Sequence, residues 1–308
     1  MARLMLVANP AASQFTGGDH RQILRLLTRR HMVEAVWPKS AIDARAIASD
    51  AVTAGFDGVV AMGGDGIVHQ VAQSLVGTDV YLAILPAGTT NVLARQMGLP
   101  SRATKAARLL TGDVALSRWP VVEVEAMTAS GDLVVHHALF AVGVGLDADV
   151  VAAAESEPYR KYRFGGIHYA RTAIRMLWSD IRRRAPSLEV RSGDRMIRAV
   201  GAMVQFREAF TYFGRWPLRF ASDAPGEMTV LSIERLPMRR LPGLLRRIAA
   251  GSIDRTPGLY VWRGIGSLSV TADPPARVET DGEVIGTVTS AHFAYRPEAL
   301  WVVGPQAD

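Results

Sequence analysis

The sequence predicts two domains, an α/β domain built on a parallel sheet and then an all-β, sandwich-like domain. Short apolar runs alternate with helical patterns over residues 1–120, and short alternating apolar runs dominate from residue 121 onward. A length of 308 residues also suits about two domains. We therefore assign residues 1–120 to the first domain, with 297–308 as a segment that could rejoin it, and residues 121–296 to the second.

The first domain consists of strands that are each followed by helices. The expected strands are residues 4–8, 32–37, 57–62 and 80–85. The expected helices are residues 20–30, 41–54, 67–76, 90–97 and 101–110. This alternation is typical of a parallel sheet with helices on both faces. Ligands of such sheets bind beyond the carboxyl ends of the strands, so the loops at those ends are the first candidates for a site.

The second domain carries strand patterns separated by turn residues, which fits an antiparallel β architecture. Two helical patterns interrupt it, at residues 167–184 and 239–250. The apolar segment 300–303 is a further strand candidate that could return to either domain.

Composition restricts the partners and the compartment. The net charge of +6 favours anionic partners such as nucleotides, nucleic acid or acidic lipid surfaces. No nucleic-acid-binding module is recognisable and aromatic residues make up only 7%, so we do not expect nucleic acid. The absence of cysteine fits a reducing compartment. The apolar segments are too short for a signal peptide or a membrane-spanning helix, so we expect neither.

The motif GGDG at residues 63–66 follows a buried strand and opens a helix. Glycines let the backbone approach phosphate oxygens, and the start of a helix offers free N–H groups and a positive dipole end. Asp65 would lie at the phosphates, where Mg²⁺ is the natural partner for its carboxylate. The alternative is a tight turn in which Asp65 is only the N-cap of the helix.

Two more polar loops are expected at the same edge of the sheet. Residues 86–91, Pro-Ala-Gly-Thr-Thr-Asn, follow the next strand, and residues 9–13, Asn-Pro-Ala-Ala-Ser, follow the first. Their hydroxyl and amide groups suit recognition of a phosphate or a ribose. For residues 86–91 the alternative is a Pro/Gly turn with Thr90 or Asn91 as a helix cap.

These motifs together resemble the diacylglycerol kinase catalytic-domain family, which includes bacterial lipid kinases, sphingosine kinases and ceramide kinases. The resemblance rests on the loop at 9–13, GGDG, the segment 86–100 (PAGTTNVLARQMGLP), FAVGVGLDADVV at 140–151, and DGE at 281–283. It implies an ATP-binding α/β domain, similar to NAD kinases and phosphofructokinases, followed by a sandwich-like second domain.

The resemblance also assigns roles to residues. The positions that match nucleotide contacts are Asn9, Ser13, Ser40, Gly63, Gly64, Asp65, Gly66, Thr89, Thr90 and Asn91. In the DGE motif Glu283 matches the general base and Asp281 would orient or polarise, while Asp65 would act through Mg²⁺ or a water network. Transfer of a γ-phosphoryl group needs such charge neutralisation and an in-line hydroxyl. Taken alone, Asp281-Gly282 between strand patterns is also a common hairpin turn.

The implied activity is ATP-dependent phosphorylation of a hydroxyl of diacylglycerol or a related lipid, as in phospholipid biosynthesis, with ATP and Mg²⁺ as cofactors. We expect a cytoplasmic enzyme that associates peripherally with a membrane. The basic, amphipathic residues 160–184 are the candidate contact, unless their apolar stripe packs on the β domain.

Two rival functions remain, an NAD-kinase-like small-molecule kinase and a nucleotide-binding pseudo-kinase. The second is suggested by Ile67, because the family usually has Thr after GGDG. The sequence leaves open which lipid is the substrate, whether Asp223 belongs to a structural metal site, and the oligomeric state, a homodimer included.

Overall fold

The computed structural model describes residues 1–112, 114–155, 185–207, 209–213, 216–219, 227–235, 243, 247 and 253–304. The chain divides into two compact units, a first unit of Met1–Val121 with Pro297–Asp308 and a second unit of Val122–Arg296. The boundary expected near residue 120 lies beside this division. The expected helix at 167–184, the basic segment 160–184, Asp223, and all of 239–250 except residues 243 and 247 lie outside the described residues.

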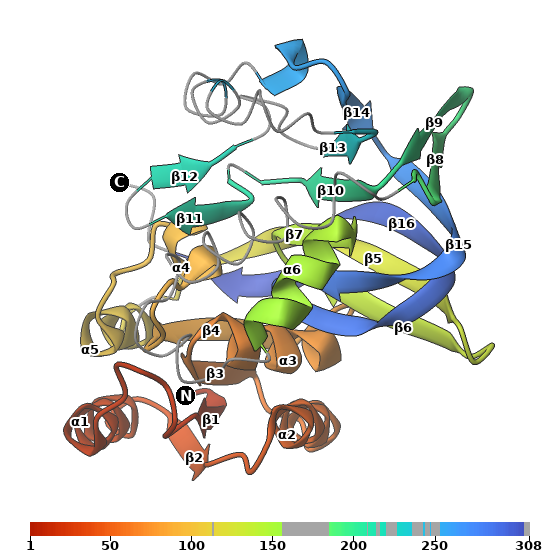
Figure 1. The fold of residues 1–308 in the computed structure, drawn as a ribbon. Coiled ribbons are helices and arrows are strands. Elements are labelled where there is room, and N and C mark those ends of the chain that lie inside the picture. The colour runs from red at the N-terminus through yellow and green to blue at the C-terminus, as the bar shows by residue number, and fades with distance from the viewer. Residues whose placement is uncertain are drawn as a thin grey trace. The chain divides into compact units, whose positions relative to one another are not determined.

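The first unit is built on a parallel sheet of four strands in the order β2-β1-β3-β4 (Figure 1). Their bounds are β1 Arg3–Ala8, β2 Met32–Val36, β3 Gly58–Gly63 and β4 Tyr81–Pro86. The last part of β16 (Glu283–Val303) adds a fifth strand, because Val302 pairs in parallel with Leu82 of β4. The returning segment therefore joins the first unit.

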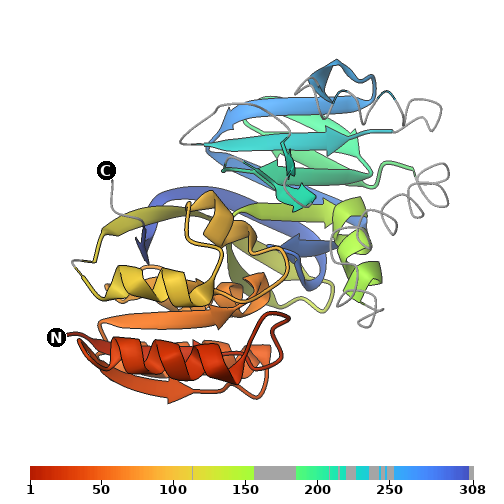
Figure 2. The same ribbon diagram turned by 90° about the vertical axis from the view of Figure 1, so that its left-hand side faces the viewer.

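Helices cover both faces of this sheet, as the alternating pattern predicts. The helices are α1 Gly17–Leu27, α2 Ala41–Thr53, α3 Asp65–Leu75, α4 Val92–Gln96 and α5 Ala103–Ala106, with the 3₁₀ turn η1 Ala107–Leu110. α1 lies beside α5 and η1 on the face turned to the viewer in Figure 2, while α2 packs against α3. Apolar residues of β1, β3 and β4 pack with those of α1, α5 and η1 in one core.

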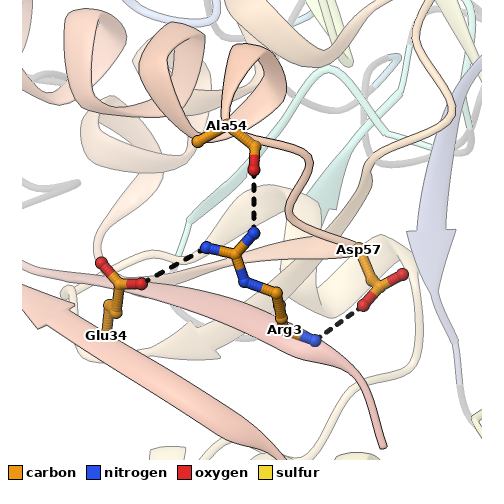
Figure 3. Close-up of polar contacts among 4 residues, drawn as sticks. All are labelled: Arg3, Glu34, Ala54 and Asp57. Atoms are coloured by element: carbon orange, nitrogen blue, oxygen red, sulfur yellow. Dashed lines mark hydrogen bonds and ion pairs between the residues drawn. The ribbon is translucent and has the colours of Figure 1, made fainter.

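Arg3 fastens the amino end of the sheet (Figure 3). Its guanidinium donates to the carbonyl of Ala54 at the end of α2 (2.9 Å) and lies 3.6 Å from Glu34 of β2. Its backbone N–H donates to the Asp57 carboxylate at 2.6 Å. These contacts join two strands and a helix at the edge opposite the polar loops, so we assign Arg3 a structural role.

The second unit is rich in antiparallel strands around its own apolar core. Its strands are the last part of β5 (Leu116–Thr128), β6 Leu133–Ala138, β7 Ala141–Gly145, β8 Leu188–Ser192, β9 Arg195–Ala199, β10 Gly201–Gln205, β11 Thr211–Phe213, β12 Trp216–Leu218, β13 Met228–Ile233, β14 Leu259–Ile265, β15 Ser267–Thr280 and the first part of β16. A short 3₁₀ turn, η3 (Ile253–Arg255), precedes β14.

One helix of the second unit, α6 (Leu146–Glu155), differs from the sequence expectation, which gave the Gly-rich segment 140–151 no helix. Gly145, with a φ of 73°, ends β7 and turns the chain directly into α6. Asp147 and Asp149 in its first turn favour the helix by interacting with the positive end of the helix dipole.

Candidate functional site

The three predicted polar loops of the first unit meet at the carboxyl edge of its sheet. In the order β2-β1-β3-β4 the connections from β1 and from β3 run in opposite directions, which makes the gap between these two strands a topological switch point. Ligands of open α/β sheets bind at such a point. The loop at 9–13 leaves β1 here and the GGDG loop leaves β3, so the sheet itself places both at the expected site.

The GGDG loop leads directly into α3. Gly64 is the N-cap, with an extended backbone, and the helix begins at Asp65, two residues before the expected start. Asp65 is therefore not the N-cap of the alternative interpretation, and lies instead in the first helical turn. Its Oδ1 atom accepts the backbone N–H of Leu93 at 3.3 Å, which connects this loop to the segment after β4.

The glycines at the two turns are required by a close approach between the loops. A Cβ atom on Gly88 would lie 2.5 Å from the Cα of Gly64, closer than side chains approach backbone. The backbone N–H of Ala87 also donates to the carbonyl of Gly63 at 2.8 Å. The GGDG loop and the loop at 86–91 thus form one continuous backbone surface, which only glycine permits at this contact.

Asn91 shapes the second loop from within. Its side chain accepts the N–H of Gly88 at 2.9 Å and donates to the carbonyl of the same residue at 2.8 Å. Asn91 has a φ of 50° and is the N-cap position of α4, although its side chain bonds back to the loop. The amide of Asn91 is thus used to close the loop.

The loop at 9–13 is bonded to the second loop. The hydroxyls of Ser13 and Thr89 lie 3.0 Å apart, and the N–H of Gln14 donates to the carbonyl of Ala87 at 2.8 Å. Asn9 donates its backbone N–H to Met62 at the end of β3. Contacts within one unit thus bring the three loops together, with Asn9, Ser13, Gly63–Gly66 and residues 88–91, Thr90 among them.

Ser40 has a different role in the structure. Its hydroxyl caps α2 by accepting the N–H of Asp43 at 3.1 Å, and the Asp43 carboxylate accepts the N–H of Lys39 at 2.6 Å. This reciprocal pattern fixes the start of the helix. The described contacts do not join Ser40 to the three loops, so its assignment to the nucleotide stays a prediction.

An aromatic cluster beside these loops was missed by sequence reasoning. The ring of Trp37, which follows β2, packs edge-on against Phe15 and His20, with centroid distances of 6.1 and 5.6 Å. The indole N–H of Trp37 donates to Nε2 of His20 at 3.5 Å. Burial, and to a lesser degree Arg21, lowers the pKa of His20, which favours the neutral ring that this bond needs. Trp37 remains 54% exposed.

In the second unit the DGE motif forms the hairpin between β15 and β16. Asp281 and Gly282 have φ values of 55° and 85°, the positive values that a two-residue type I′ turn requires. The interpretation of Asp281-Gly282 as a hairpin turn is therefore confirmed. Both oxygens of the buried Asp281 carboxylate accept backbone N–H groups, from Leu139 at 2.7 Å and from Phe140 and Ala141 at 3.0 and 3.1 Å. Asp281 anchors the turn.

Glu283 is the first residue of β16 and is half-buried. Asp281 is held by three backbone donors, and Glu283 is the next carboxylate of the motif along the chain. Next to this turn lie two more acids that the sequence did not single out, Asp147 of α6 and Glu279 of β15. The Oε2 atom of Glu279 accepts the N–H of Gly282 at 2.7 Å.

The departure at Ile67 has a packing explanation. Ile67 is 7% exposed, and a Cβ atom on Gly63 would clash with its Cγ2 atom. The side chain fills the space beneath the GGDG loop. The isoleucine supports the loop from inside, while the backbone of residues 63–66 is retained.

Comparisons with known proteins identify this kind of fold. The chain is similar to the crystal structure of a diacylglycerol kinase from Bacillus anthracis (TM-score 0.69, 17% identity, covering 99% of this chain and 97% of the other). It is also similar to an NAD kinase from Archaeoglobus fulgidus in complex with ATP (TM-score 0.52, 14% identity, 98% and 93% covered). The α/β part and the strand-rich part predicted from the sequence are thereby confirmed as the fold shared by these kinases.

Sequence comparisons find relatives of part of this chain. Residues 3–117 match the diacylglycerol kinase catalytic domain. A diacylglycerol kinase of Mycobacterium tuberculosis is 42% identical over 100 residues, 32% of this chain and 31% of that protein. A YegS-like probable lipid kinase of Pseudomonas aeruginosa is 42% identical over 84 residues, 27% of each chain. These matches confirm the resemblance that the sequence motifs indicate.

These matches cover about a third of the length of the Mycobacterium relative. Among the described residues no helix combines the length and the apolar character that crossing a bilayer requires.

Proposed function

We propose that the protein is an ATP-dependent lipid kinase that transfers the γ-phosphoryl group to a hydroxyl of diacylglycerol or a related lipid. The observation that carries this proposal is the joining of three polar loops at the switch point of the parallel sheet. Two of them meet through Gly64 and Gly88, and this contact leaves a backbone surface that a triphosphate can approach. The kinase family of residues 3–117 supports the same function.

The residues at this edge suit a nucleotide that brings its own metal ion. Mg²⁺ is commonly held by one or two carboxylates together with phosphates and water. Asp65, half-buried in the first turn of α3, would hold it. The described residues contain no group of three or more acids or histidines that could hold a metal without a ligand. When bound, Mg²⁺ would neutralise charge on the phosphates.

The resemblance and the structure of the DGE turn both favour Glu283 as the general base. Glu283 would accept the proton of the lipid hydroxyl. Asp281 would fix the turn through its three backbone hydrogen bonds. We further propose a peripheral membrane association, since the acceptor is a lipid; the basic segment 160–184 is the candidate contact.

A labelled-phosphate transfer assay tests this function. The full chain is incubated with ATP labelled at the γ position, Mg²⁺ and vesicles containing diacylglycerol, ceramide or other lipid alcohols. Label in the organic-extractable fraction supports a lipid kinase. Label only in an aqueous product such as a phosphorylated dinucleotide would favour the NAD-kinase-like alternative, and intact ATP binding without any transfer would favour a pseudo-kinase.

Trp37 gives this function a specific prediction. Strands in a sheet lie about 4.8 Å apart, so the end of β2 is roughly 10 Å from the end of β3, a span that an extended nucleotide can bridge. The exposed indole would then stack on the base while the triphosphate lies on the glycine turns. We expect Trp37→Ala to weaken ATP binding about tenfold, because stacking on an aromatic ring contributes roughly 1–3 kcal/mol per base.

Isothermal titration calorimetry with ATP and with tripolyphosphate measures this effect. Trp37→Phe keeps a ring and should retain most of the ATP affinity. Tripolyphosphate has no base, so its affinity should be the same for the wild type and Trp37→Ala. Equal weakening of both ligands would show that Trp37 supports the loops and does not contact the base.

A further inference from the structure

The acid pair of the second unit, Asp147 and Glu279, is an anomaly of this structure. Glu279 is 1% exposed, and the Oδ2 atom of Asp147 is fully buried. Burying a carboxylate is unfavourable unless it is paired or hydrogen-bonded. Yet Oδ2 of Asp147 faces no hydrogen-bond donor among the described residues as long as both acids are ionised.

The two carboxyl groups meet over a glycine. A Cβ atom on Gly143 of β7 would lie 2.7 Å from Oε1 of Glu279 and still closer to Oδ2 of Asp147. Gly143 is the direct partner of Glu279 across the β7–β15 ladder. The absence of a side chain at this position is what lets the two oxygens approach the same point.

Among the described residues, no positive charge acts on Asp147 or Glu279 to balance two anions. The neighbouring charge that acts on Glu279 besides Asp147 is the carboxylate of Asp281. Across the ladders Glu279 faces the uncharged Gly143 and Val284. Arg277, the nearest described cation along β15, is 2.7 Å from Asp149 and is paired with it.

We propose that Asp147 and Glu279 hold one proton between them, and that this protonated pair positions the Asp281–Gly282 turn and thereby Glu283. Two ionised carboxylates are acceptors only, whereas one proton converts them into a hydrogen-bonded pair. The first turn of α6 favours the anion on Asp147. Glu279 then carries the proton on Oε1 and donates it to Oδ2 of Asp147, while its Oε2 accepts the N–H of Gly282.

The titration behaviour of the pair agrees with this arrangement. Burial raises the pKa of Asp147 to about 6, although its hydrogen bond with Glu279 acts in the opposite direction. Burial, followed by the charge of Asp147, raises the pKa of Glu279 well above the usual range of a glutamate. Glu279 is therefore the member of the pair that keeps the proton longer as the pH rises.

Glu279 is a positioning residue in this scheme, because it acts on Glu283 through the turn. The role in catalysis rests on the proposed function of Glu283; the shared proton does not. Above the pKa of Glu279 in the folded chain, two buried anions would repel each other beside the turn. We therefore expect the turn to loosen and kcat to fall at alkaline pH, with little change in the KM for ATP or lipid.

Glu279→Gln tests the proposal, since an amide can donate to Asp147 and accept from Gly282 without titrating. The folded wild type keeps a proton that the unfolded chain releases above the ordinary carboxyl pKa. Its free energy of unfolding should therefore fall as pH rises from that value to the raised pKa of Glu279. Glu279→Gln should lack this fall. Its melting temperature should therefore rise relative to that of the wild type as the pH increases from the ordinary carboxyl pKa toward the raised pKa of Glu279.

Activity gives the second readout. Glu279→Gln should keep a kcat close to that of the wild type at neutral pH and should lose the alkaline decline, whereas Glu279→Ala should lower kcat about tenfold or more at every pH. Glu125→Gln, an exposed carboxylate on β5, is the matched control and should follow the wild type. An unchanged pH profile of both stability and kcat in Glu279→Gln would overturn the proposal.

Infrared spectroscopy of the wild type removes any dependence on how the variants fold. A protonated carboxyl group gives a C=O stretching band distinct from that of carboxylates, and we expect this band to persist at neutral pH. Its absence would refute the shared proton even if the kinase activity is established. If instead the band is present and no lipid is phosphorylated, the proposed function fails while the proton pair stands.

Discussion

Glu283→Gln should lower kcat by about 10²–10⁴-fold, the range by which a positioned general base accelerates proton transfer. Glutamine has the same size and keeps a hydrogen-bonding oxygen, but it does not accept the proton of a lipid hydroxyl. ATP affinity should stay unchanged, because the proposed nucleotide site is formed by the loops at residues 9–13, 63–66 and 86–91, which do not include Glu283. Steady-state kinetics with a lipid acceptor and calorimetric ATP titration measure the two quantities.

Two other substitutions sharpen this experiment. Glu298→Gln removes an exposed carboxylate from the same strand, β16, and should leave kcat unchanged.

Asp281→Asn should instead lower the free energy of unfolding by about 1–3 kcal/mol, because an NH₂ group would face backbone N–H donors in place of a carboxylate oxygen. A Glu283→Gln enzyme that turns over within tenfold of the wild type would remove Glu283 from the mechanism.

Gly88→Ala should have the second large effect, on both stability and nucleotide binding. The added Cβ would lie 2.5 Å from the Cα of Gly64, so the two loops would have to separate. Overpacking of this kind costs about 1–3 kcal/mol. We also expect a loss of more than about tenfold in ATP affinity, because misplaced loop N–H groups no longer converge on the phosphates. Thermal unfolding and ATP titration measure the two effects.

Gly112→Ala is the matched control in the same unit. A Cβ at Gly112 would meet no described atom within 4 Å, so neither stability nor ATP affinity should change. If Gly88→Ala bound ATP as tightly as Gly112→Ala, the continuous backbone surface would not be the phosphate site, and the proposed location of the nucleotide would have to be abandoned.

Local chemistry made much of the first unit predictable. The GGDG and Pro-Ala-Gly loops are visible in the sequence because turn residues directly follow apolar strands, and the structure places both at the carboxyl edge of the sheet. The start of α3 at Asp65 was misjudged by two residues because Gly64, which has no capping side chain, leaves no signal for an N-cap. The reason for the glycine at position 88 was also hidden, since it is a contact with another loop.

The features that sequence reasoning missed depend on contacts between distant segments. Nothing in the sequence singles out Asp147 or Glu279. They become a pair because β7 and β15 align Gly143 with Glu279, and because Gly143 has no side chain to keep the carboxyl group of Asp147 away. In the sequence, Trp37 is only the last residue of a predicted strand. Its role in an aromatic cluster depends on Phe15 and His20, which come from another segment. Asp281 was assigned by motif, and only its three backbone partners reveal that it is an anchor.

The pairing of Val302 with Leu82 bears on how the chain is made. Strands β1 to β4 are synthesised early, whereas the end of β16, which pairs with β4, is synthesised only after the whole second unit. During that interval the edge of β4 offers unpaired backbone groups to other chains, which is a route to aggregation. Fragments that stop at residue 121 should therefore self-associate, and adding a peptide of residues 297–304 should reduce this tendency.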